Sequence, residues 1–548
     1  MFCAECWGRI SSDGQILIFM NPSLDLLADA GHSTAPVFIS MTVEGESLHM
    51  IRGIVRWNKT LWKVVVLTGI LTVWCMVFTA GAVQAQNPEK PSLSLRDKSP
   101  DTVKYMGAGS CNASGCHGLL DLKKRKFTIL QNEYWLWDWN AADQRNKLDY
   151  GHSKAFENLK TPESRQMAKH LGLKSPETEP RCLACHAVPV PESRRGPNYE
   201  LAEGVTCEGC HGAAELWLGP HTRKDWDKKK GAEYGMLDTK NLVKRAELCL
   251  RCHQGTEKDM VDHELIGAGH PRLSFELDSY SELMPVHWIV PKEEKEWSGA
   301  RIWAVGQAEA LHQQLELLAA SRKSQPMMWP DFTFFDCYAC HHDVADRVRG
   351  ISESEKKLQR WRVKDHAGKK PGRLVWNAAN YTVFRHAVRE VLPDKAAVLD
   401  EAFAKLHELL TGKSGAAELD PLLSQLLQVS SQLGSSLETH PFTQKEVWSI
   451  LRRISGDATV IANAGFQSAE QAVLAISSLQ ESYNRTVGAM PNAKAFSAAL
   501  DQLNNDIVFG YKFNLVQFSQ HLSGMRKLLD SDTPPASGAG ASPAKAGS

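Results

Sequence analysis

The sequence lacks an excess of charge of either sign, because lysine plus arginine and aspartate plus glutamate each number 63. Nucleic-acid binding usually needs a clustered basic surface, so this balance argues against nucleic acid as a partner. Beyond residue 85 the chain also lacks any cysteine outside a small set of motifs. No thiol is then left over for disulfide bonds or for thiol catalysis.

Ten of the thirteen cysteines lie in five motifs in which a histidine directly follows the second cysteine. The motifs are Cys111, Cys116 and His117; Cys182, Cys185 and His186; Cys207, Cys210 and His211; Cys249, Cys252 and His253; and Cys337, Cys340 and His341. Four have the spacing of a c-type haem attachment site, and the first has two extra residues between its cysteines. In such a site the thiols become thioethers on the porphyrin and the histidine ligates the iron. The sequence therefore predicts five covalently attached haem c groups, with these five histidines as proximal ligands.

A second strong axial ligand usually keeps the iron of an electron carrier low-spin. Thirteen other histidines lie beyond residue 85, and at most five of them can serve in this way. We predict His152, His221 and His270 as distal ligands, because each lies in a short polar or glycine-containing segment that a porphyrin could cover. His263 and His287 remain open between a ligand and an ordinary role. For the other eight we prefer an ordinary packing or surface role.

Residues 50–85 read as an export signal, which haem attachment outside the cytoplasmic membrane requires. Basic residues precede an apolar run over residues 64–78, and Val83 and Ala85 suit the −3 and −1 positions of a cleavage site before Gln86. We expect an exported, periplasmic or extracytoplasmic protein. The alternative is a retained anchor, since a run of about 15 to 20 residues is marginal for a bilayer; membrane contact is expected only in that case. Residues 1–49 are interpreted as an extension from an over-long gene model that truly starts at Met50.

The rest of the chain divides into a linker, a haem region and a helical region. Residues 86–105 are the linker, and residues 106–350 are a compact pentahaem domain with little regular structure, because the porphyrins themselves supply apolar core surface. Successive proximal histidines are 69, 25, 42 and 88 residues apart, so no fixed repeat is present. We expect a helix over residues 300–322 that packs beside the fifth haem.

Residues 351–530 contain no cysteine and show helical periodicity. Leu399, Phe403, Leu406 and Leu410 form one apolar stripe, and further helices are expected at about 467–486 and 493–530. The predicted fold is therefore mainly α, with a multihaem domain followed by a helical bundle that is a candidate for docking or dimerisation. Residues 531–548 are rich in Pro, Gly, Ala and Ser and are expected to be disordered.

The order of motifs over residues 106–275 resembles the cytochrome c-552/4 family, best known from the tetrahaem carrier of ammonia-oxidising bacteria. The resemblance rests on the first motif, Gly-His152-Ser-Lys-Ala-Phe, the second motif, Gly-Val-Thr-Cys207-Glu-Gly-Cys-His-Gly and Gly-Pro-His221. It implies a mainly helical protein with closely spaced haem pairs that passes single electrons outside the cytoplasmic membrane. It also implies that His221 ligates opposite His117 and His152 opposite His211, and that the haem on His186 has no second protein ligand. The fifth motif, the lengthened first motif and the helical region depart from the family pattern.

Two functions follow from these observations. The preferred one is an electron carrier between redox protein partners, which needs no catalytic residue. The alternative is a redox enzyme acting on a small nitrogen or sulfur species at a five-coordinate haem. Pentahaem nitrite reductases typically mark the catalytic iron with a lysine in place of the motif histidine, and no Cys-x-x-Cys-Lys occurs here. A scaffold role for the helical region is compatible with either function.

Overall fold

The computed structural model describes residues 7–10, 16–19, 99–120, 131–138, 151–284, 288–290, 295–324, 330–337, 375–411, 416–508 and 513–531. The chain divides into one unit formed by Met1–Ser23 and Leu93–Ser548 and a second formed by Leu24–Ser92. The expected signal segment 50–85, most of the linker and residues 532–548 lie outside the described residues. Two short strands, β1 (Trp7–Ile10) and β2 (Ile16–Phe19), pair in antiparallel fashion.

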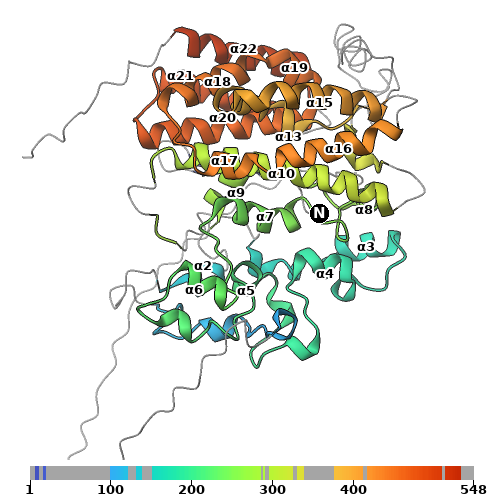
Figure 1. Ribbon diagram of the computed structural model, residues 1–548, viewed down its shortest axis with the longest axis vertical. Helices are drawn as coiled ribbons and strands as arrows, with labels where there is room; N and C mark the ends of the chain where they lie inside the picture. The colour runs from blue at the N-terminus through green and yellow to red at the C-terminus, as the bar shows by residue number, and fades with distance from the viewer. Residues whose placement is uncertain are drawn as a thin grey trace, which may run out of the picture. The chain divides into compact units, whose positions relative to one another are not determined.

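The described part of the larger unit is mainly helical, as predicted (Figure 1). The haem region holds short helices joined by loops and 3₁₀ turns. These helices are α2 (Glu133–Trp137), α3 (Pro162–His170), α4 (Pro180–His186), α5 (Cys207–His211), α6 (Lys228–Glu233), α7 (Leu242–His253), α8 (His263–Ala268) and α9 (Leu277–Leu283). The described helices that follow are α10 (Ser298–Ser324), α13 (Ala379–Thr382), α14 (Arg385–Val391), α15 (Pro393–Thr411), α16 (Ala416–Ser430), α17 (Leu433–Glu438), α18 (Gln444–Gly456), α19 (Ala458–Asn463), α20 (Phe466–Thr486), α21 (Ala493–Ile507) and α22 (Leu515–Ser531).

The periodic stripes read from the sequence are the buried faces of these helices. Leu399, Phe403, Leu406 and Leu410 are all buried on α15, as a stripe at three-to-four spacing requires. The helix expected at about 467–486 is α20. The span expected at about 493–530 is two helices, α21 and α22, which pack against each other.

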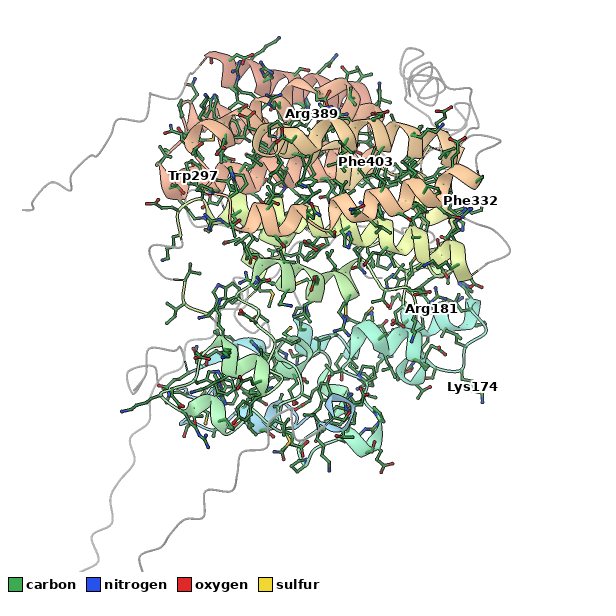
Figure 2. The ribbon with its side chains drawn as sticks, in the orientation of Figure 1. Lys174, Arg181, Trp297, Phe332, Arg389 and Phe403 are labelled. Atoms are coloured by element: carbon green, nitrogen blue, oxygen red, sulfur yellow. The ribbon has the colours of Figure 1, made fainter. Side chains whose placement is uncertain are left out.

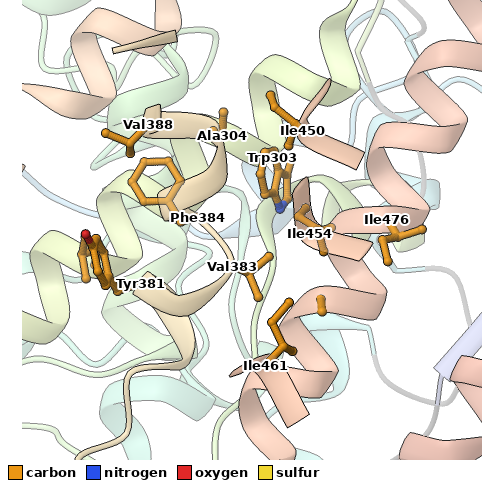
Figure 3. Close-up of a cluster of buried hydrophobic side chains, with 14 of the residues drawn as sticks. Trp303, Ala304, Tyr381, Val383, Phe384, Val388, Ile450, Ile454, Ile461 and Ile476 are labelled. Carbon is orange, nitrogen blue, oxygen red and sulfur yellow. The ribbon is translucent and has the colours of Figure 1, made fainter. Parts of the chain in front are cut away.

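One large apolar core joins α10 to the helices that follow residue 375. Trp303 on α10 is fully buried and lies near Phe384, Ile450 and Ile454 (Figure 3). α10 also packs against α7 and α9 of the haem region (Figure 1). The helix α10, which we expected beside the fifth haem, is therefore a central element of the helical core. It also connects this core to the haem region through its contacts with α7 and α9.

The haem region itself has few buried apolar side chains. Among the described residues, two small apolar clusters lie there, one around Leu250 and Phe275 and one around Phe156, Leu159 and Leu183. Ion pairs supplement them: Arg181 on α4 lies against Asp262, with 2.6 Å between Nη2 and Oδ2, and Asp262 caps α8 (Figure 2). Among the described helices, none is long and apolar enough to cross a membrane.

Candidate haem-binding site

Three of the motifs lie on short helices that end at the motif histidine. α4 ends at His186, α5 at His211 and α7 at His253. Residues three and four apart lie on the same face of a helix, so the Cys-x-x-Cys-His spacing turns both thiols and the imidazole to one side. The local helix thus presents all three attachment groups to one ligand.

The first and fifth motifs differ from these three. The lengthened first motif is a turn after a short 3₁₀ helix (Ala108–Cys111), closed by a hydrogen bond from the His117 amide to the Cys111 carbonyl at 3.2 Å. Of the fifth motif, only Cys337 is described; Cys340 and His341 lie outside the described residues. His287, His342 and His366 lie outside them as well.

The motif thiols lie close together in two places. Contact with the Cys207 thiol of the third motif lowers the pKa of the Cys111 thiol of the first motif. Contact with the Cys252 thiol of the fourth motif raises the pKa of the Cys185 thiol of the second motif. None of the nine described cysteines forms a disulfide, so no disulfide competes with haem attachment at these two pairs. The fold therefore brings the motifs together two by two.

Six of the motif and candidate histidines meet as three imidazole pairs. The ring centres of His117 and His221 are 6.1 Å apart and nearly parallel. Those of His152 and His253 are 6.2 Å apart, and those of His186 and His270 are 6.5 Å apart, with both pairs close to perpendicular. All three distal candidates selected from the sequence thus lie opposite a motif histidine.

This spacing fits an iron between two imidazoles. Two metal–nitrogen bonds of about 2 Å, with about 1 Å from each nitrogen to its ring centre, separate the ring centres by about 6 Å. Aromatic rings in proteins pair with centres about 4.5 to 7 Å apart, so the distance alone is shared with ordinary ring contacts, and the motif cysteines beside each pair are what point to haem. The residues present therefore fit a haem iron with two histidine ligands.

Hydrogen bonds to backbone carbonyls fix the tautomer of three of these six histidines. The Nδ1 atom of His186 donates to the Ala155 carbonyl at 2.8 Å, that of His221 to the Trp217 carbonyl at 3.0 Å and that of His270 to the Pro271 carbonyl at 2.7 Å. With the proton on Nδ1, the lone pair is on Nε2, which is the nitrogen that binds a metal. Burial lowers the pKa of all three imidazoles, which keeps them neutral and able to ligate.

His117 has a carboxylate partner instead of a carbonyl. Its Nδ1 lies 3.0 Å from Oε2 of Glu133 on α2, and this hydrogen bond raises the pKa of His117. A carboxylate in this position orients a ligating histidine and makes its other nitrogen more basic. Sequence reasoning missed Glu133, because nothing in its local pattern marks it as a partner of a residue 16 positions away.

The pair formed by His152 and His253 differs from the pairing that the family resemblance implied. The two residues Gly204 and Val205, just before the third motif, hold the His152 backbone. The Val205 amide donates to the His152 carbonyl at 2.9 Å, and Gly204, which has a positive φ of 72°, packs closely against the same carbonyl. The His152 ring, however, meets His253 at the end of α7. His186, for which the resemblance implied no second protein ligand, faces His270. His211, which ends α5, accepts a hydrogen bond at its backbone carbonyl from the Leu237 amide at 3.0 Å.

The other described histidines have ordinary surroundings. His263 is exposed and its ring lies against Phe332, with 5.2 Å between the ring centres. The side-chain partners are the Ala268 carbonyl for His170, Ser430 for His312, Asp457 for His386, Glu446 for His440 and Asp506 for His521. The backbone carbonyl of His407 accepts from the Thr411 hydroxyl at 2.7 Å. These contacts fit the packing and surface roles that we expected for these six residues, and His263, which the sequence left open, lies on the surface.

A buried carboxylate joins the first and third motifs. Glu208 lies between the two cysteines of the third motif and is 2% exposed. Its Oε1 accepts from the amides of Met106 at 2.8 Å and Ala214 at 2.7 Å, and its Oε2 accepts from the amide of Gly107 at 2.7 Å. Glu208 therefore secures the segment that leads into the first motif against α5.

Comparison with known families found one match. Residues 142–212 match the family model for cytochrome c554 and c-prime. The matched stretch contains His152 and the second and third motifs. It supports a multihaem cytochrome c family, covalently bound haem c and a haem-based role in electron transfer. No curated protein and no solved structure matches the chain significantly.

Proposed function

We propose that this protein is an exported c-type cytochrome with five haems that transfers single electrons between redox protein partners. The observation that carries the proposal is the set of three imidazole pairs, each spaced for one iron and each containing a motif histidine. When bound, each haem supplies an iron centre that takes up and releases one electron. The export signal at residues 50–85, the fifth site at His341 and the redox partners are parts of this proposal that rest on the sequence.

The protein's own residues have three tasks in this function. The motif cysteines would hold the porphyrins covalently, and the paired histidines would ligate the iron. The carbonyls of Ala155, Trp217 and Pro271 hold three of the imidazoles in the ligating tautomer. An iron held by two histidines would have no open position for a substrate and would rearrange little on reduction, as rapid electron transfer requires.

Close packing of the motifs would keep electron transfer within the protein. The thiol contacts bring the first motif beside the third and the second beside the fourth. Porphyrins attached at adjacent thiols would lie near one another, which favours transfer along the chain of haems. This argument concerns the four motifs that the structure describes completely.

The test is a haem count combined with electron paramagnetic resonance on the oxidised mature protein. We expect five covalent haems by the pyridine haemochrome assay and only low-spin ferric signals that nitrite, hydroxylamine and nitric oxide do not change. A high-spin signal that shifts with one of these ligands would instead support the enzyme alternative. A protein that attaches no haem would overturn the proposal.

A further inference from the structure

Residues 270–282 form a segment with proposed haem ligands on one side. His270 pairs with His186. The Phe275 ring stacks on the His253 ring with 4.8 Å between centres, and the Tyr280 ring meets His253 edge-on at 5.4 Å. The segment therefore supplies one ligand of the second motif's haem and covers the proximal ligand of the fourth.

The same segment is held on its other side by one carboxylate of the helical region. Glu470 on α20 has a side chain that is 3% exposed. Nη2 of Arg272 donates to its Oε1 at 2.7 Å, and Oγ of Ser274 donates to its Oε2 at 2.7 Å. The Arg272 guanidinium also lies over the Phe466 ring, 5.0 Å from its centre. Both oxygens of Glu470 are thus used to hold residues next to His270 and Phe275.

Further contacts continue along the same face of α20, which packs on α9 (Figure 1). The Gln471 side chain donates to the Phe275 carbonyl at 3.3 Å, and the Ser478 hydroxyl donates to Glu276 at 3.0 Å. Two helical turns beyond Ser478, the Arg485 guanidinium donates to the Glu282 carboxylate at 2.9 Å. Positions seven or eight apart recur on one helix face, so α20 contacts the segment along most of its length.

We propose that Glu470 is a positioning residue for the haem ligands of the second and fourth motifs. Through Arg272 and Ser274, Glu470 sets where His270 stands opposite His186 and how Phe275 covers His253. The helical region would then act on the coordination and reduction potential of two haems that it does not itself ligate. This inference rests on the proposed function, since it concerns histidines as haem ligands.

The Arg272–Glu470 ion pair is better suited to positioning the segment than to simply attaching it to α20. Burying a charged pair costs desolvation energy that its attraction barely repays, and an apolar contact of the same size would fasten the segment as well. What the pair adds is fixed geometry, because a guanidinium and a carboxylate meet in few orientations. That geometry is placed two residues from His270.

The test compares Glu470→Gln with Asp457→Asn in the full-length holoprotein. Asp457 is a matched control because it forms a partly buried ion pair with Arg385 elsewhere in the helical core and does not touch the segment. We expect both variants to melt at lower temperature and to keep the wild-type haem count. Only Glu470→Gln should shift or broaden one or two low-spin resonance signals and move the corresponding reduction potentials.

Ser274→Ala keeps the inference testable if Glu470→Gln does not accumulate, because it removes a single hydrogen bond to Glu470. It should perturb the same resonance signals to a smaller extent. Wild-type haem content with unchanged signals and potentials in the Glu470 and Ser274 variants would overturn this inference alone. A wild-type protein without covalent haem would overturn the proposed function and this inference with it.

Discussion

Replacement of Glu208 by glutamine tests how the first and third motifs are held together. The carboxylate accepts three short backbone hydrogen bonds in a site that is 2% exposed. Glutamine has nearly the same shape but only one oxygen. If that oxygen takes the place of Oε1, it keeps the bonds from Met106 and Ala214, and its NH₂ group then faces the amide N–H of Gly107.

The expected loss of stability follows from these bonds. A buried N–H left unpaired costs about 1–3 kcal/mol, and a bond to a charged acceptor contributes about 1 kcal/mol more than a bond to a neutral one. Burial raises the pKa of Glu208, so removing its charge recovers part of the desolvation cost. We therefore expect Glu208→Gln to lower the free energy of unfolding by about 2–4 kcal/mol.

Thermal or denaturant unfolding of the holoprotein measures this change, with Glu203→Gln as the control. Glu203 is also a partly buried glutamate beside the first motif, but it accepts a single bond from the Ala108 amide at 3.3 Å. Its replacement should cost less than about 1 kcal/mol. Equal stability of the Glu208 variant and the wild type would refute the role given to Glu208.

Three further predictions concern the core, the pH dependence of stability and the position of one ligand. Trp303→Ala should cost about 3–5 kcal/mol in unfolding experiments because Trp303 is fully buried, whereas Val460→Ala, at a 46% exposed position, should change stability by less than about 0.5 kcal/mol. Burial, with repulsion from three neighbouring glutamates, raises the pKa of Glu309 from 4.5 to about 7. The folded protein therefore favours the protonated carboxyl, so the contribution of Glu309 to stability is full below pH 4.5 and is lost as the pH rises through about 7. Glu309→Gln should therefore raise the melting temperature relative to wild type at pH 8 and not at pH 4.5, and an equal difference at both would contradict the assignment. Gly204→Ala should change one low-spin resonance signal, because Gly204 has a positive φ and a Cβ there would lie 2.6 Å from the His152 carbonyl oxygen; an unchanged spectrum would show that this approach does not position His152.

The helices were predictable from sequence where one face is strongly apolar. The stripe on α15 is a regular pattern of large residues, and the pattern alone marks its buried side. The division of residues 493–530 into α21 and α22 was missed, since apolar residues continue through the connection between the two helices. The central place of α10 could not be read from its sequence either, because periodicity shows that a face is buried and not what covers it.

The site was predictable to a similar depth. The Cys-x-x-Cys-His spacing predicts the proximal histidines, because attachment needs those groups on one face of a short helix. The distal partners depend on how distant segments fold together, and here His152 faces His253, while the resemblance had implied His211. Glu208 and Glu470 act through contacts with residues about 100 to 200 positions away, and single-sequence patterns do not carry that information.

The central claim is that the paired imidazoles are the axial ligands of haem irons, and His221→Ala tests it most directly. His221 faces His117 with 6.1 Å between ring centres, and His440 in the helical region, which hydrogen-bonds to Glu446, serves as the control. In electron paramagnetic resonance of the oxidised proteins, we predict that His221→Ala converts one low-spin signal to a high-spin signal and leaves the haem count unchanged, while His440→Ala matches the wild type. A His221→Ala spectrum identical to that of the wild type would contradict the account.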